Sequence, residues 1–277
     1  MKIIRFSFFV LAMTVVVSTY LFAQDYKLQR QKDISFSLHP RIGVAGNYHS
    51  ANFVFFKGMA DCGTVESSFG IGFSAGIAIE KHISLKSAFS LGFNYVNRGI
   101  QFNNENKYPM RNIDGTLTSV VTNTSLAISL SFFEIQPDFR FLISEDLFGG
   151  AFRTVAGIRM LLPLTNSFEQ SEHIVTPSSA VFLSTQTQNR LLASGDIHSI
   201  GGFWFGLCFG FENQIELSEN YRFSQQLLLD YNFGNLCTDA DWKILGFRLE
   251  IGFPICLSSK PEKTQLSPKE QKPPLMN

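Results

Sequence analysis

Strict alternation of bulky apolar residues with small or polar ones recurs about eight times in this chain after residue 30. The clearest copy runs from Ser68 to Glu80, where odd positions carry Phe, Ile or Ala and even positions carry Gly, Ser, Ala or Glu. A period of two places every apolar side chain on one face of an extended strand. The pattern therefore predicts an all-β protein.

The weaker face of these strands distinguishes a soluble sandwich from a membrane barrel. A soluble sheet would carry Lys, Glu, Thr and Gln there, whereas this face is mostly Gly, Ser and Ala, and the apolar runs hold most of the 29 Phe among 277 residues. Beyond the N-terminal run, no stretch is apolar for the ~20 residues that a membrane helix needs. Lipid requires every backbone polar group to be paired internally, so the sheet must close. We predict a closed antiparallel up-and-down transmembrane β-barrel of eight strands, with its apolar face toward lipid.

The N-terminus has the layout of a secretory signal. Lys2 and Arg5 precede an apolar run from Phe6 to Ala23, and polar Gln24 follows. This arrangement predicts cleavage after Ala23, with a cut after Ser18 and an uncleaved helical anchor as alternatives. The expected organisation is a signal peptide at 1–23, an outer-membrane barrel at 24–256 and a disordered periplasmic tail at 257–277, where the composition turns polar and Pro-rich.

The alternation predicts eight strands, and the connections between them predict an orientation. Short polar turns at 80–84, 144–147 and 218–220 alternate with long connections at 47–66, 98–123 and 164–196. Periplasmic turns of barrels are short and external loops long, so both termini are expected in the periplasm. The loop at 164–196 has room for a further pair of strands, above all at Ala180–Ser184. The predicted strands are 33–46, 67–80, 84–97, 124–143, 148–163, 197–217, 221–234 and 241–256.

Two positions interrupt the regular pattern. Pro40 falls within the first strand, where it lacks a backbone donor and favours an edge or a bulge. In the fourth strand, the apolar residues change from even to odd positions at Phe132-Phe133, which predicts a β-bulge there.

Several segments resemble outer-membrane β-barrel domain proteins of the PorT and OmpA-transmembrane type. They are the signal sequence, the eight alternating segments, Phe139-Arg140-Phe141 after Glu134-Ile135-Gln136-Pro137, and the closing strand from Phe247 to Phe253. The resemblance covers residues 30–256 and implies a Gram-negative outer-membrane barrel without a catalytic motif. OmpA-type proteins often carry a peptidoglycan-binding domain after a Pro-rich linker. Here only a linker-like tail follows the barrel, so peptidoglycan binding is not expected.

The alternation places thirteen charged side chains on the inward face. Eight strands enclose an interior only wide enough for side chains, and buried charges are costly unless they are paired. We therefore expect a lumen plugged by salt bridges, with a gated proton or ion path along the same residues as the alternative. The residues are Arg41, Glu80, Lys86, Glu134, Asp138, Arg140, Arg153, Arg159, Glu212, Arg222, Asp230, Arg248 and Glu250.

The charge balance and the cysteines exclude several classes of partner. With 23 basic and 23 acidic residues and no basic stripe, a nucleic-acid partner is not expected. The four cysteines lack the close pairing of a zinc site, and no metal or cofactor is predicted. Cys62 and Cys237 fall in loops that meet where the first and last strands close, which predicts a disulfide between them. Cys208 is expected inside the lumen and Cys256 near the periplasmic end of the last strand.

Histidines provide no clear catalytic arrangement. His198 lies beside Asp196 and Ser199, but adjacent residues of a strand point to opposite faces, so a nucleophile–base pair is not expected. His39 is expected to be a hydrogen-bonded lumen residue. The predicted role is therefore non-enzymatic: a structural or loop-binding barrel that contacts outer-membrane lipid and an extracellular ligand or protein. The alternatives are a small-solute pore or accessory of protein export, and a hydrolase at the barrel rim.

Overall fold

The computed structural model describes residues 36–53, 65–84, 86–111, 117–217, 222–238 and 240–257. Within these ranges, no helix is long and apolar enough to cross a bilayer. The proposed signal peptide lies outside them, as does the tail except Leu257, which ends the last strand instead of starting the tail. The strands are β1 Phe36–Phe53, β2 Val65–His82, β3 Ser87–Asn97, β4 Ile100–Arg111, β5 Leu117–Leu147, β6 Gly150–Thr176, β7 Asn189–Asp196, β8 Trp204–Glu216, β9 Arg222–Asn232, β10 Asp241–Gly252 and β11 Ile255–Leu257.

Eight of these strands form a closed antiparallel ring. The sheet runs β5-β3-β2-β1-β10-β9-β8-β6, and the pairing of β6 with β5 closes it. The predicted eight-stranded barrel is therefore confirmed. β11 continues the line of β10 along β1, so it adds no member to the ring.

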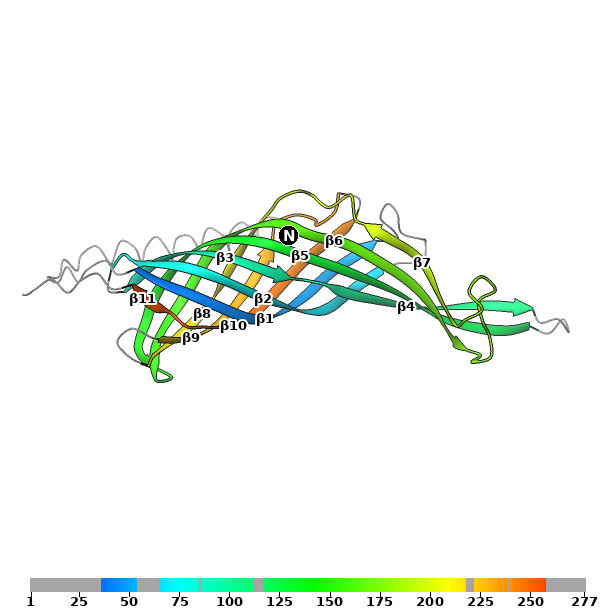
Figure 1. The fold of residues 1–277 in the computed structure, drawn as a ribbon, viewed down its shortest axis with the longest axis horizontal. Coiled ribbons are helices and arrows are strands. Elements are labelled where there is room, and N and C mark those ends of the chain that lie inside the picture. Colours follow the sequence, from blue (N-terminus) through cyan, green and yellow to red (C-terminus); the bar gives the residue numbers. More distant parts are fainter. Residues whose placement is uncertain are drawn as a thin grey trace, which may run out of the picture. The chain divides into compact units, whose positions relative to one another are not determined.

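The remaining two strands lengthen one side of the barrel. β4 follows β3 along β5, and β7 precedes β8 along β6. Figure 1 shows these strands continuing past the ends of β1, β2 and β10. We call this part the β4–β7 extension: β4, residues 117–128 of β5, residues 167–176 of β6, and β7.

The extension corrects the predicted loops. The connection at 98–123 contains β4 and the start of β5, and the connection at 164–196 contains the end of β6 and β7. Ala180–Ser184 is not a strand; the additional strand of that region is β7. Residues 197–203, predicted to begin the sixth strand, precede β8 and contribute a single bridge between Ile200 and Cys237. The alternation missed β4 because its inward face is apolar only at Ile100 and Phe102, and polar residues follow on both faces from Asn103 to Lys107.

The irregularity at Pro40 involves a second proline across the ladder. β1 keeps one register with β10 and β11, so Pro40 lies opposite Phe253 and His39 opposite Pro254. Prolines have no N–H to donate to a ladder. The pairing consequently divides the last strand into β10 and β11, while the Phe253 amide still donates to the Pro40 carbonyl at 3.1 Å.

The predicted bulge at Phe132-Phe133 is wrong for β5. Even-numbered residues of this strand stay buried from Val120 to Arg140, so its phase never changes. The irregularity lies in the neighbouring strand, where Thr165 pairs with Ser131 and Pro163 with Phe132, leaving Leu164 unmatched in β6. Along β5, what changes is the chemistry of the inward face, from Phe132 to Glu134.

An apolar belt surrounds the ring. Large apolar side chains point outward at every second position of the ring strands, such as Ile42 and Val44 on β1, each 57 % exposed. On β1 the belt ends at Tyr48, and on β5 exposed Ser129 lies beyond it. Such a surface suits hydrocarbon better than water, because soluble proteins rarely expose large contiguous apolar patches.

Candidate functional site

The interior of the ring holds equal numbers of positive and negative groups. Alternate residues of every ring strand point inward, which buries their charged side chains. Among the described residues, the ring buries six arginines and six carboxylates, each no more than 8 % exposed: Arg41, Arg98, Arg140, Arg153, Arg159, Arg248, Glu80, Glu134, Asp138, Glu212, Asp230 and Glu250. Such charges require partners, since unpaired ions are expensive to bury.

The first ion-pair group centres on Arg140 and lies toward the start of β1; we call it the Arg140 group. Arg153 donates to Glu80 at 2.7 Å, and its Nη2 forms an ion pair with Glu212 at 2.6 Å. Arg140 contacts the same two carboxylates at 2.9 and 3.0 Å and reaches Asp138 at 2.8 Å. Two guanidinium groups therefore hold three carboxylates, drawn from β2, β5 and β8.

The second group lies further along the barrel and centres on Arg248; we call it the Arg248 group. Arg248 contacts Glu134 at 2.9 Å, Asp230 at 3.0 Å and Glu250 at 3.1 Å. Arg159 also binds Glu134, through both Nε and Nη2. Arg98 reaches Asp230 at 2.8 Å from the break between β3 and β4.

One neutral side chain links the two groups. The buried amide of Gln136 donates from Nε2 to Asp138 at 3.2 Å and accepts at Oε1 from Arg248 at 2.8 Å. Gln136 stands between Glu134 and Asp138 on the inward face of β5, at the level where one group ends and the other begins. The two groups thus form one hydrogen-bonded network.

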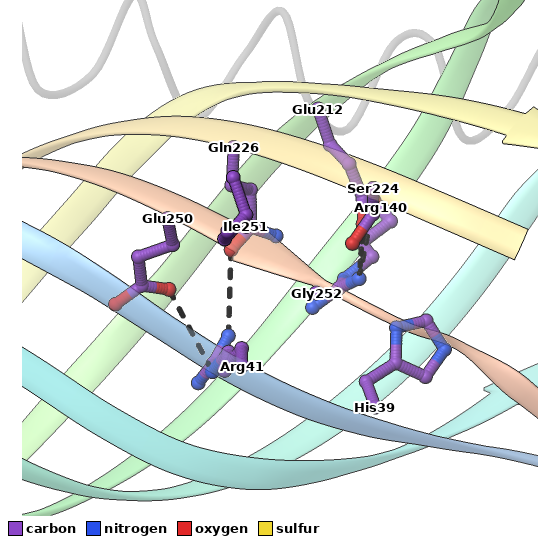
Figure 2. Close-up of a pocket in the computed structure, with 9 residues that line it drawn as sticks. All are labelled: His39, Arg41, Arg140, Glu212, Ser224, Gln226, Glu250, Ile251 and Gly252. Carbon is purple, nitrogen blue, oxygen red and sulfur yellow. Dashed lines mark hydrogen bonds and ion pairs between the residues drawn. The ribbon is translucent and has the colours of Figure 1, made fainter.

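A small pocket lies beside this junction (Figure 2). Arg41 donates to Asn94 at 3.0 Å and to Gln226 at 3.4 Å, and its Nε lies 3.7 Å from Glu250 Oε2. The pocket presents two arginines and two glutamates, so it has no net charge with which to select an ion. Its lining consists of His39, Arg41, Arg140, Glu212, Ser224, Gln226, Glu250, Ile251 and Gly252.

An apolar layer fills the other end of the lumen. Trp242 is fully buried and donates from its indole N–H to His49 Nδ1 at 3.0 Å. Phe132 packs edge-on against Trp204, and Phe102 against Trp242. Along β1 the inward residues change from Ser37, His39 and Arg41 to Ala45, Asn47, His49 and Ala51, so side chains fill the ring along its length.

Comparison with protein families identifies the fold's relatives. The family described as "Outer membrane protein beta-barrel domain" matches residues 22–237. This chain belongs to that family. No curated protein matches it.

Several solved structures are similar to this chain at low sequence identity and low TM-score. Ail, the attachment invasion locus protein of Yersinia pestis, solved with the heparin analogue sucrose octasulfate, is 10 % identical with a TM-score of 0.31, over 80 % of this chain and 100 % of Ail. Neisserial surface protein A is 12 % identical with a TM-score of 0.32, over 79 % and 96 % of the two chains. OprG from Pseudomonas aeruginosa is 11 % identical with a TM-score of 0.28, over 83 % and 100 %.

In this outer-membrane barrel, ten of the thirteen predicted lumen charges lie in the two groups, and Arg41 is buried beside Glu250 of the Arg248 group. Lys86 does not: it is exposed and precedes β3, outside the ring interior. Arg222 is the first residue of β9 and half-exposed, so it also falls outside the network. Both corrections have the same reason. A residue at an inward position is buried only where the neighbouring strands extend past it, whereas Lys86 precedes β3 and Arg222 begins β9.

Among the described charges of the ring interior, Arg98 is the one that the sequence analysis missed. It lies after the predicted end of the third strand, within the segment interpreted as a loop. The even-numbered residues of β3 point inward, at Gly92, Asn94 and Val96, and Arg98 follows in the same alternation. Extending the alternation by two residues would have predicted that Arg98 is buried.

Of the residues considered for other chemistry, His198 and Asp196 are exposed and Ser199 is half-buried. In the part of the chain that the structure describes, no hydrogen bond joins these three side chains. Cys208 is buried and inward, as expected, between Gly157 and Asp230.

The predicted disulfide remains a prediction. Cys237 is buried, but Cys62 lies outside the described residues. Cys256 pairs through its backbone with Ser37, at the end of the barrel where β1 begins.

Glycine at position 246 makes room for Arg98. A Cβ built on Gly246 would collide with Arg98 Nη1 and lie 3.2 Å from Asp230 Oδ2. We expect Gly246→Val to lower the free energy of unfolding by about 1–3 kcal/mol, the usual cost of overpacking. Denaturant titration of the purified barrel measures this loss, and the same substitution at Gly202, where a Cβ meets no atom within 4 Å, is the control. Equal losses at both positions would contradict this account of Gly246.

Proposed function

We propose that this chain is a non-conducting outer-membrane barrel that presents the β4–β7 extension as an external binding surface. The observation that carries the proposal is the filled lumen: two linked ion-pair groups followed by an apolar layer. A porin-like path needs a continuous polar channel, whereas the layer around Trp242 and Phe132 interrupts it with side chains that bind no ion.

The orientation is proposed from the lengths of the connections. Only Phe148 and Gly149 separate β5 from β6, and four residues separate β2 from β3, at the end where β1 begins. Short turns characterise the periplasmic side of outer-membrane barrels. The start of β1 and the end of β11 would then face the periplasm, and the β4–β7 extension would stand outside the cell.

Planar-bilayer recording tests the closed lumen. The reconstituted protein is expected to show no steady conductance, because the buried charges pair with one another and an apolar layer blocks the lumen beyond them. An open porin in the same bilayer serves as the positive control. A stable open channel in the unmodified protein would overturn the proposal and favour the small-solute pore.

A further inference from the structure

We propose that the outward face of the β4–β7 extension binds the sugar chain of the glycolipid that surrounds the barrel in the outer leaflet. The inference rests on the proposed function, because it requires the extension to be external. It adds the ligand class and the residues that contact the ligand.

The strand register aligns the outward side chains in rows across the extension. One row joins Gln101 of β4, Ala127 of β5 and Glu169 of β6. The next joins Asn103, Ser125 and Ser171. Small residues occupy β5 while longer polar ones stand on β4, so the rows are polar or small from β4 to β6.

The chemistry of this face suits neutral hydroxyl groups. The Gln101 amide donates to Ser125 Oγ at 2.7 Å and to Asn103 Oδ1 at 3.3 Å, which fixes three side chains in one orientation. Amides and hydroxyls offer both donors and acceptors, as sugar hydroxyls do. Held in place before binding, they lose little conformational entropy when a ligand arrives.

The same rows are poorly suited to two other classes of ligand. A polyanion would need a cluster of basic residues, whereas Lys107 lies beside Glu105 at 3.5 Å and Glu169 adds a negative charge. A protein interface normally has aromatic or Arg anchors at its centre, and here the centre holds Ala127, Ser125 and Ser171.

The position of the face selects the outer-leaflet glycolipid as the source of the sugar. On β5 the apolar belt gives way to exposed Ser129, and the row containing Ala127 follows directly above it. Acyl chains contact the belt, so the next part of a surrounding glycolipid, its sugar chain, lies at the level of these rows.

The test uses the full-length protein in detergent micelles and polysaccharide released from lipopolysaccharide by mild acid, with binding measured by calorimetry. We expect the wild type to bind the polysaccharide and the Gln101→Ala, Asn103→Ala double variant to bind about tenfold more weakly, as loss of one to two hydrogen bonds predicts. Gln225→Ala, which removes an exposed amide near the periplasmic end of β9, is the matched control and should bind normally. Heat-modifiable gel migration confirms that each variant is folded.

Two further probes identify the ligand class. Lipid A, which lacks the sugar chain, and heparin, a sulfated polysaccharide, are both expected to bind no differently to wild type and double variant. The inference is overturned if the polysaccharide does not bind, if both proteins bind it equally, or if the variant affects only lipid A or heparin. None of these binding results depends on whether the lumen conducts. Failure of the inference is therefore distinguishable from failure of the proposed function, which the bilayer recording decides.

Discussion

Replacement of Arg248 by Leu is expected to lower the free energy of unfolding by about 3–5 kcal/mol, the usual cost of breaking a buried ion pair. Arg248 is fully buried and contacts Glu134, Asp230 and Glu250 within 3.1 Å. Its loss would leave three carboxylates sharing fewer cations in a lumen that cannot hydrate them. Denaturant titration, with heat-modifiable gel migration as the measure of folded barrel, gives the change.

Arg222→Leu is the matched control for this experiment. Arg222 is half-exposed at the start of β9 and lies opposite Glu216 at the barrel end, where water screens the charges. Exposed pairs typically contribute about 0–1 kcal/mol. If the Arg248 and Arg222 variants lost equal stability, the ion-pair groups could not be the main source of lumen stability.

At the next residue, adding an arginine rather than removing one is expected to destabilise the barrel. Leu249 points away from the lumen and is 56 % exposed within the apolar belt. Leu249→Arg is expected to cost about 2–4 kcal/mol near the bilayer midplane, because the guanidinium would enter hydrocarbon. The same substitution at Phe73 or Phe205, which are 49 % and 48 % exposed, should give similar losses. Phe93, also on the outward face, provides a fourth position.

Gly206→Leu separates lipid exposure from lumen packing. A Cβ at Gly206 would lie 2.5 Å from the Tyr231 carbonyl oxygen, so the larger residue should clash inside the ring whatever the lipid thickness. The Leu249→Arg loss should instead shrink in thinner bilayers, where the charge lies closer to water. Tolerance of Arg at all of the outward positions would show that the assignment of faces is wrong.

The ring was predictable because two solvents act on its two faces. Hydrocarbon outside and a charged lumen inside impose opposite chemistry on successive residues, as in the neighbours Arg248 and Leu249. That contrast reveals strand number, parity and most of the charged network from sequence alone. It also identifies the inward position of Cys208 on β8.

The contrast between the two faces disappears where a strand does not separate hydrocarbon from the charged lumen. In the extension, both faces of β4 carry polar residues, so no alternation marks it as a strand. In the apolar layer the inward face is itself hydrophobic, so the sequence pattern of Leu130 and Phe132 looks like that of residues facing lipid. The apparent phase slip in β5 has this origin. Arg98 was missed for a related reason, since it lies after the last recognisable alternating residue of β3.

Gln136 joins two charge clusters that are not individually neutral. Counting only arginines and carboxylates, the Arg140 group has two positive and three negative residues, and the Arg248 group, with Arg41 beside Glu250, has four positive and three negative. The interior is therefore an electric dipole of opposite unit charges aligned along the barrel, although its total charge is zero. Removing one carboxylate from the first cluster together with one arginine from the second abolishes that dipole and keeps the lumen neutral. Two such substitutions should consequently cost less together than the sum of their separate losses, a non-additivity typical of residues in one charge network.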